Sequence, residues 1–360
     1  RIIDRHSDIA LAGMGITPVS FSPDGQIIAS GGHDEEIWVQ TLDGRLIAVL
    51  TGHKSSINKV TFSPDGKILA SGSWDNTIKL WDKDGKLLKT FQHSYPKNKR
   101  ESYMNSDEVR IFQGVLDIVF SPDGKMLASA SEDGTIKIWQ LNGKLISTIS
   151  GHNNKIRSIS FSPDSQMIAS ASSDNTIKVW KKNGELVSIL TGHTGAVNKV
   201  KFSPDGQMII SASNDGTIRY WSLSSNSIFT LGADNAKINS VSFSPNGKII
   251  ASASTDGTVK LWNRNGALLN TLVGHDDSVN KVIFSPDNKI IASASADHTV
   301  KLWNSQGRLL NTLIGQFQQG INDVKFSPDG NLIASTDFLG INIWKSTGEH
   351  LSNIINKTDG

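Results

Sequence analysis

Residues 202–221, FSPDGQMIISASNDGTIRYW, decide how this chain folds. Pro204-Asp205-Gly206 combines a fixed φ, an Asx-type turn residue and a glycine that tolerates positive φ, which together favour a hairpin turn. The small and β-branched residues from Met208 to Ser213 predict a strand. Asn214-Asp215-Gly216 predicts a second turn, and residues 217–221 predict the strand that follows it.

Two further strands are expected on either side of this stretch. Residues 198–203 alternate in the manner of a strand, and another strand is expected at about 227–231. In most other copies the turn before the fourth strand is Asn-Gly or Asp-Gly, such as Asn183-Gly184, which favours a two-residue hairpin. A four-stranded antiparallel meander that is apolar on both faces is not stable alone, so it must stack on neighbouring copies.

The same pattern recurs along the whole chain. Eight of the ten prolines follow Phe-Ser, and the eight phenylalanines are separated by 41, 58, 41, 41, 41, 41 and 42 residues. Seven of the nine tryptophans fall in one column of the third strand, and the exceptions are Trp38 and Trp74. Self-similarity at this period outweighs any other sequence signal. The chain is therefore predicted to be all-β, with eight units of four strands.

Composition narrows the classes of function. The 360 residues include no cysteine, which excludes disulfide frameworks, cysteine-ligated zinc and thiol catalysis. The formal net charge of +2 lacks the basic excess of a nucleic-acid-binding protein, and no apolar run approaches the about 20 residues that span a membrane. Tight His or Asp clusters and phosphate-binding glycine loops do not occur, so we expect no metal and no cofactor. The start at Arg1, without an initiator methionine or an apolar signal segment, suggests a fragment of a longer protein.

Gly-His, Phe-Ser-Pro-Asp-Gly and Asp-Gly-Thr-Ile-Lys-Leu-Trp elements, repeated about every 40–45 residues, resemble the WD40 family. The resemblance implies a β-propeller, whose blades surround a central channel. We predict one eight-bladed propeller at residues 16–356, with seven blades plus one extra unit as the alternative. Residues 1–15 would form an N-terminal segment, closing strand or linker, and residues 357–360 a tail. The style of the repeats also resembles bacterial, especially cyanobacterial, WD40 arrays in multidomain signalling proteins.

The resemblance further implies a buried network inside the blades. In four units a His is followed by an Asp 22 residues later and by a Trp 28 residues later. In the family these side chains are joined by a serine of the second strand, which in the second unit is Ser71 or Ser73. A Ser-His-Asp set could also indicate nucleophilic catalysis, but four copies around a ring favour a structural element. The four sets are His53, Asp75 and Trp81; His152, Asp174 and Trp180; His193, Asp215 and Trp221; and His275, Asp297 and Trp303.

Four units depart from this pattern and are predicted to open more readily than the others. In the first unit Gln40 stands in the Trp column, and Trp38 lies two residues earlier. The His column holds Ile111 in the third unit, Ala233 in the sixth and Gln316 in the eighth, and the eighth unit also has a one-residue deletion near Phe338. The 58-residue interval adds 17 residues at about 93–111, including a basic segment at 97–100. Such an insertion is either a loop that contacts a partner or ligand, or a solvated excursion.

WD40 proteins generally bind peptides or protein surfaces on the face that carries the loops between strands four and one and between strands two and three. By the family's pattern, two columns of this chain lie there: the residue before the turn Asp, and the residue after the first apolar residue of strand one. From these columns we select Trp74, Arg157, Leu116, His33 and Glu132, together with a ring of amides formed by Asn58, Asn198, Asn239, Asn280 and Asn322. Trp74 is either a binding hot spot or a cover for the adjacent blade.

These features predict a non-enzymatic interaction module. The leading hypothesis is a monomeric, cytoplasmic propeller that serves as a scaffold or sensor within a larger bacterial signalling protein. Its partner would be a protein, a peptide or a neighbouring domain of the same chain, and we expect no membrane contact. The alternative is an enzyme or small-ligand binder that uses the central channel, although the channel-facing columns look repetitive and uncharged. Nucleic-acid binding through residues 97–100 is disfavoured by the near-zero net charge.

Overall fold

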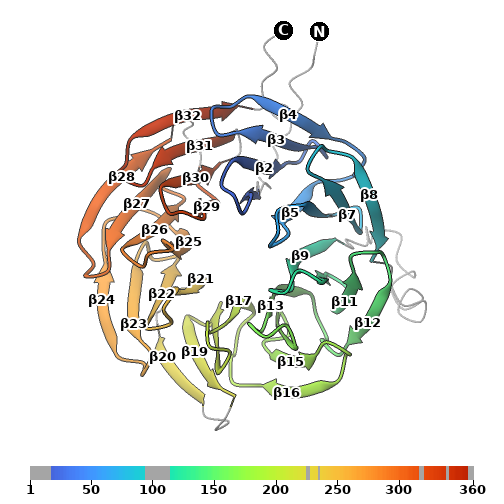
Figure 1. Ribbon diagram of the computed structural model, residues 1–360. Coiled ribbons are helices and arrows are strands. Elements are labelled where there is room, and N and C mark those ends of the chain that lie inside the picture. The colour runs from blue at the N-terminus through green and yellow to red at the C-terminus, as the bar shows by residue number, and fades with distance from the viewer. Residues whose placement is uncertain are drawn as a thin grey trace, which may run out of the picture.

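The computed structural model describes residues 18–93, 114–223, 228–233, 236–315, 320–337 and 340–355. These residues form eight antiparallel sheets of four strands, arranged as blades in a closed ring (Figure 1). The all-β class and the eight-bladed propeller are thereby confirmed, and the alternative of seven blades with an extra unit is excluded. The described segments include no helix long and apolar enough to cross a membrane.

Each blade consists of four consecutive strands, and the strand order in every sheet follows the chain. The first strand of each blade lies nearest the centre of the ring and the fourth lies at its rim (Figure 1). The first four blades comprise β1 (Val19–Phe21), β2 (Ile27–Gly31), β3 (Ile37–Thr41) and β4 (Leu46–Leu50); β5 (Ile57–Phe62), β6 (Ile68–Ser73), β7 (Thr77–Asp82) and β8 (Leu87–Gln92); β9 (Val115–Phe120), β10 (Met126–Ser131), β11 (Thr135–Gln140) and β12 (Leu145–Ser150); and β13 (Ile156–Phe161), β14 (Met167–Ser172), β15 (Ile177–Lys181) and β16 (Leu186–Leu190). The last four comprise β17 (Val197–Phe202), β18 (Met208–Ser213), β19 (Thr217–Ser222) and β20 (Ile228–Ala233); β21 (Ile238–Phe243), β22 (Ile249–Ser254), β23 (Val259–Asn263) and β24 (Leu268–Leu272); β25 (Val279–Phe284), β26 (Ile290–Ser295), β27 (Thr299–Asn304) and β28 (Leu309–Ile314); and β29 (Asp323–Phe326), β30 (Leu332–Thr336), β31 (Gly340–Lys345) and β32 (His350–Ile355).

The Pro-Asp-Gly segments form the turn between the first and second strands, as their composition predicts. The Ser203 hydroxyl donates to the Asp205 carboxylate at 2.5 Å, and the Gly206 N–H donates to the Ser203 carbonyl at 2.9 Å. Gly206 has a φ of 72°, in the left-handed region that glycine adopts without strain. Ser165 and Asn288 occupy the same position in other blades, at φ values of 61° and 64°.

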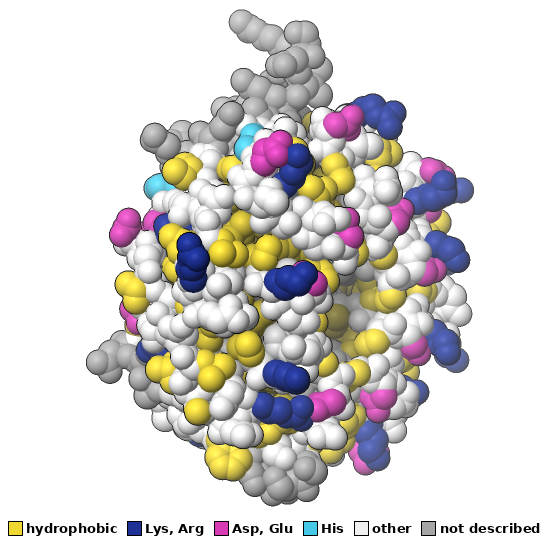
Figure 2. Space-filling view, turned by 60° about the vertical axis from the view of Figure 1, so that its left-hand side comes forward, with side chains coloured by type: hydrophobic (Ala, Val, Ile, Leu, Met, Phe, Trp, Pro, Cys, Tyr) yellow, Lys and Arg dark blue, Asp and Glu magenta, His cyan; other side chains and the backbone are white. Residues whose placement is uncertain are grey.

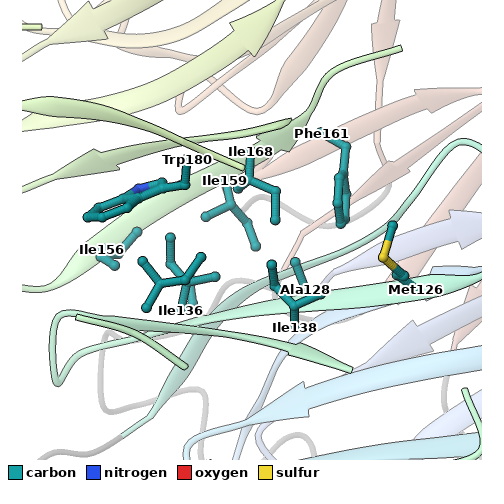
Figure 3. Packing of buried hydrophobic residues seen from close by; sticks show 11 residues of the cluster. Met126, Ala128, Ile136, Ile138, Ile156, Ile159, Phe161, Ile168 and Trp180 are labelled. Carbon is teal, nitrogen blue, oxygen red and sulfur yellow. The ribbon is translucent and has the colours of Figure 1, made fainter. Parts of the chain in front are cut away.

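The hydrophobic core lies between adjacent blades. Ile136 and Ile138 of β11 form one cluster with Ile159 and Phe161 of β13 and with Trp180 of β15 (Figure 3). An equivalent cluster fills each of the other seven interfaces between blades. Because each blade buries its apolar faces only against its neighbours, the ring is stable as a whole rather than blade by blade.

The first and last blades meet without exchanging a strand. β1 pairs within its own sheet, as does β32. Across this seam Val19 and Phe21 pack with Ile341 and Ile343, and the Ser352 hydroxyl donates to the carbonyl of residue 42 at 3.0 Å. Side-chain packing therefore holds the described ends of the ring together. The closing strand expected at residues 1–15 lies outside the described residues, and so does the tail at 357–360.

The rim of the ring carries exposed aliphatic side chains. Most fourth strands begin with two apolar residues, and Leu268, Leu269, Leu309 and Leu310 are about half exposed. Charged side chains separate the apolar ones over the visible surface (Figure 2). The rim is therefore a mixed surface.

Candidate binding face and the buried networks

A hydrogen-bonded series of side chains runs through four of the blades. In the fifth blade His193 Nδ1 lies 2.8 Å from Asp215 Oδ2, and His193 Nε2 lies 2.7 Å from Ser211 Oγ. The indole N–H of Trp221 donates to the same Ser211 oxygen at 2.9 Å. The equivalent distances in the second, fourth and seventh blades lie between 2.7 and 3.0 Å, with Ser71, Ser170 and Ser293 as the linking serines.

The carboxylate determines the protonation pattern of this network. Burial opposes ionisation of Asp215, but hydrogen bonds from Thr217, Thr194 and His193 outweigh it and lower the pKa of this carboxyl to about 2. An ionised carboxylate requires the proton of the imidazole on Nδ1, so that Nε2 accepts the hydroxyl of Ser211. The serine oxygen then accepts the indole N–H, and every member has a partner.

The linking serines decide between the structural and the catalytic interpretation. All four are fully buried, and each serine oxygen already accepts an indole N–H. A nucleophile must be reachable by its substrate, and these four are enclosed. The Ser-His-Asp sets therefore serve the packing of the blades.

The third blade contains a histidine that the repeat spacing did not assign to it. His93 follows β8 and is fully buried, with Nδ1 3.0 Å from Ser129 Oγ and Nε2 2.9 Å from Thr135 Oγ1. The indole N–H of Trp139 donates to the same Ser129 oxygen at 3.2 Å. The third blade therefore keeps a histidine in its network, although Ile111 stands at the usual spacing. The repeat spacing, counted back from Phe-Ser-Pro, points to Ile111 because the additional residues lie after His93; the hydrogen bonds of His93 to Ser129 and Thr135 are what assign it to this blade.

The environment of His93 differs from that of the other network histidines. The nearest carboxylate oxygen, Asp133 Oδ1, lies 3.8 Å from Nε2. Burial lowers the pKa of His93 to about 4, although the charge of Asp133 acts in the opposite direction. Burial also lowers the pKa of His193 and of His275, against their aspartate partners. All three imidazoles are therefore neutral in the folded protein at pH 7.

We expect the protein to lose stability as the pH falls from about 6.5 towards 4. Unfolded histidine takes up a proton near pH 6.5 whereas buried His93 does not, so acid favours the unfolded chain; for His93 the loss between pH 7 and pH 5 is about 2 kcal/mol. Urea unfolding at both pH values measures it. His93→Gln should show a weaker pH dependence, whereas exposed His350→Gln should behave like the wild type. A wild-type stability that is the same at both pH values would contradict the expectation.

Two of the irregular blades retain part of the network, and the first does not. In the sixth blade the Trp262 indole donates to Ser252 at 3.1 Å, and in the eighth the Trp344 indole donates to Ser335 at 3.2 Å. In the first blade the buried Gln40 stands in the tryptophan column. The other departures, at Ile111, Gln316 and Phe338 and in the side chain of Ala233, lie outside the described residues. Greater opening of the irregular blades stays a prediction.

β-Bulges orient the asparagines of the second column. In the second blade the register shifts between Ile57 and Lys59, so Asn58 is the extra residue and its side chain turns towards the next blade. Its Nδ2 group donates to the Val115 carbonyl at 2.8 Å. Asn198, Asn239 and Asn280 likewise donate to a backbone carbonyl of the following blade at 2.9–3.0 Å. These amides join adjacent blades. Asn322 is held through its backbone N–H, which donates to the Thr336 carbonyl at 2.9 Å.

The larger side chains chosen for the face form one connected strip across the first four blades. His33 Nδ1 lies 2.8 Å from Ser56 Oγ, and the carbonyl of Ser56 accepts the backbone N–H of Trp74 at 2.9 Å. The indole of Trp74 lies over Gly114, where a Cβ atom would come within 2.9 Å of the ring. The Gly114 carbonyl in turn accepts the N–H of Glu132 at 3.0 Å. Trp74 is half-buried, so it covers the third blade and also presents part of its ring to solvent.

The far end of the strip is charged. The carboxylate of Glu132 is 11% exposed and lies 3.5 Å from Lys155 Nζ. Burial raises the pKa of Glu132, although the charge of Lys155 acts against it. Arg157 is exposed and donates from Nε to Ser173 Oγ at 2.7 Å, and Leu116 is half-buried. The strip therefore runs from an aromatic end on the first and second blades to a charged end on the third and fourth.

The central channel differs from the expectation of uncharged columns. Asp117 Oδ1 lies 3.9 Å from Lys59 Nζ, and Asp117 Oδ2 lies 4.0 Å from Lys199 Nζ, on two different blades. Lys281 Nζ lies 2.5 Å from Asp323 Oδ1. The expectation was wrong because a bulge in the first strand changes which residues face the channel. Lys59, Lys199 and Lys281 each come directly after the bulged asparagine of their strand.

Comparison with protein families adds two matches. A model described as WD domain, G-beta repeat matches residues 6–39, 44–82, 266–304 and 307–339. A model described as the first β-propeller of IFT122 matches residues 114–268. The matched segments follow one another along the chain and cover most of the eight blades. A search among curated proteins finds no match.

Proposed function

The chain belongs to the WD40-repeat family of β-propellers, and from this premise we propose that it is a non-enzymatic scaffold that binds a peptide or protein on the strip across blades one to four. WD40 propellers generally act as protein-interaction scaffolds and are typically not enzymes. The strip is defined by His33, Trp74, Leu116, Glu132 and Arg157.

The observation that carries the proposal is the uneven distribution of large side chains over this face. The column that holds His33, Trp74 and Glu132 in the first three blades continues as Ser173, Asn214, Thr255 and Ala296. The amides of blades five to seven are directed into contacts between blades. Large aromatic and arginine side chains supply most of the binding energy in protein interfaces, and here they are gathered on one half of the face.

The chemistry of the strip points to a particular kind of peptide. Trp74 offers an aromatic surface for an apolar anchor residue. Lys155 lies next to Glu132, which leaves the charge of exposed Arg157 for a carboxylate of the partner. We therefore infer a ligand that combines an apolar or aromatic residue with an acidic one.

A displayed peptide library, selected on the intact chain, tests the proposal. We expect enriched peptides with an acidic and an apolar position, and at least tenfold weaker binding to Trp74→Ala and to Arg157→Ala in calorimetric titrations. Matched controls on the rim are Phe229→Ala and Arg308→Ala, both at exposed positions, which should bind within twofold of the wild type. Enriched peptides that bind all four variants equally, or a library without enrichment, would refute it.

The setting of the module is a separate part of the proposal. The Phe-Ser-Pro-Asp-Gly repeats support a cytoplasmic, monomeric propeller within a larger bacterial signalling protein, because this style resembles the arrays of such proteins. A neighbouring domain of the same chain is then a candidate partner for the strip. Sedimentation analysis of the chain tests the monomeric state, since a ring that buries all its blade interfaces internally needs no second copy.

A further inference from the structure

Charged side chains from five blades gather around the centre of the ring. They project from the first strands, which Figure 1 shows nearest the centre. Asp117 on the third blade is close both to Lys59 on the second and to Lys199 on the fifth, and blades that are not neighbours can meet only across the central channel. The group, called here the channel cluster, consists of Lys59, Lys199, Lys201, Lys281, Lys325, Asp117 and Asp323.

Both carboxylates of the channel cluster are already paired with lysines. Asp117 lies between two lysines and also accepts the N–H of Ile159 at 3.1 Å. Asp323 is paired with Lys281 at 2.5 Å. Among the described residues, Lys201 and Lys325 have no ion-pair partner, and five lysines face two carboxylates. The described channel therefore holds three more lysines than carboxylates.

The pKa values of two of these lysines are lowered. The charge of Lys281, together with burial, holds the pKa of Lys325 well below its usual range. Burial lowers the pKa of Lys199 to about 7, and the neighbouring lysines act in the same direction. Like charges held this close repel one another, and an anion between them would remove the repulsion.

The channel has room for an anion and remains accessible to water. At the end that carries the Phe-Ser-Pro turns, a cavity of about 520 Å³ is lined by Lys325, Ser20 and Ser242, with Phe243 and Phe284 among its apolar walls. This volume lies within the range of small-molecule sites, about 300–1,000 Å³. Lys201 is not among the residues that line this cavity, but it is exposed and its charge acts on Lys325.

We propose that the central channel binds a small polyanion with three or more negative charges, held by Lys201 and Lys325 at the end that carries the Phe-Ser-Pro turns. The ligand class is a molecule with several phosphate or carboxylate groups, because lysine ammonium groups act as point charges that suit either. This site lies within the channel, whereas the strip lies on a face of the ring, so the two can be tested independently.

Calorimetric titration of the intact chain with tripolyphosphate, citrate and sulfate tests the proposal. We expect tripolyphosphate or citrate to bind at least tenfold more tightly than sulfate, and the tighter of the two identifies the phosphate or the carboxylate class. In the double variant Lys201→Gln/Lys325→Gln the affinity should fall at least tenfold. The control Lys67→Gln/Lys289→Gln makes the same change of charge at two surface turns, where both side chains are 80% exposed, and should bind within twofold of the wild type.

Thermal unfolding provides a readout that does not depend on calorimetry. The bound anion should raise the Tm of the wild type and of the surface control but not that of the channel variant. Without ligand, the channel variant should melt no lower than the wild type, because it loses repulsion rather than a pairing. The proposal is overturned if none of the three anions binds, or if the surface control loses as much affinity as the channel variant.

Discussion

Replacement of Asp117 by alanine should lower the free energy of unfolding by about 3–5 kcal/mol, as expected when one partner of a buried charge pair is removed. The Asp117 side chain is 8% exposed and draws together the second, third, fourth and fifth blades through Lys59, Ile159 and Lys199. Burial opposes its ionisation, but Lys199, Lys59 and the Ile159 N–H outweigh burial and lower the pKa of Asp117. Without this carboxylate the lysines repel one another and the Ile159 N–H loses its acceptor.

Chemical denaturation followed by tryptophan fluorescence measures this loss. The control is Glu185→Ala, which removes an exposed carboxylate paired with Lys181 on the surface and should leave stability unchanged. Tripolyphosphate should recover part of the stability of Asp117→Ala if the channel binds anions. An unfolding free energy within 1 kcal/mol of the wild type would show that Asp117 does not hold the channel lysines together.

Ser211→Ala should destabilise the fifth blade by about 2–4 kcal/mol, because it leaves two buried polar groups without partners. These are the indole N–H of Trp221 and the Nε2 atom of His193, at 2.9 and 2.7 Å from the serine oxygen. Ser252→Ala in the sixth blade is the matched control. Among the described residues, Ser252 accepts a bond from the Trp262 indole alone, so the expected loss is about 1–2 kcal/mol.

Hydrogen exchange separates the effect on one blade from the effect on the whole ring. Amides of β17, β18 and β19 should lose the most protection in Ser211→Ala, whereas those of β21, β22 and β23 should do so in Ser252→Ala. Equal losses in the two variants would show that the histidine adds nothing to the serine–tryptophan pair. The network would then not explain why the histidines recur in the repeats.

Much of the fold could be predicted because the signals that specify it are local. Pro-Asp-Gly places the turn within five residues, as the bonds of Ser203, Asp205 and Gly206 show. Alternation along each strand specifies which residues are buried between blades, and eight repeats specify eight blades. His93 was missed for the opposite reason. An insertion breaks the constant spacing, and the contacts of His93 with Ser129 and Thr135 assign it to the third blade.

The binding strip and the channel cluster depend on contacts between blades, which the spacing of the repeats does not predict. The asparagine column was chosen as an exposed ring, yet Asn58 donates to Val115 on the next blade because a bulge redirects its side chain. The same bulge brings Lys59 to the channel. A shift of one residue in register turns the side chains of a strand to the opposite face, and the sequence pattern does not show where such a shift occurs.

By itself, the sequence determined the four-stranded unit, its turns, the number of blades and the residues of the His-Asp-Trp sets, because hairpins and short strands are specified by neighbours in the chain. Only the tertiary structure decided that Lys59, Asp117 and Lys199 meet, and that His33, Trp74 and Glu132 form one strip. Closure of the ring brings side chains of distant first strands together, such as Asp117 Oδ2 and Lys199 Nζ at 4.0 Å. That proximity is a property of the ring, and no single repeat contains it.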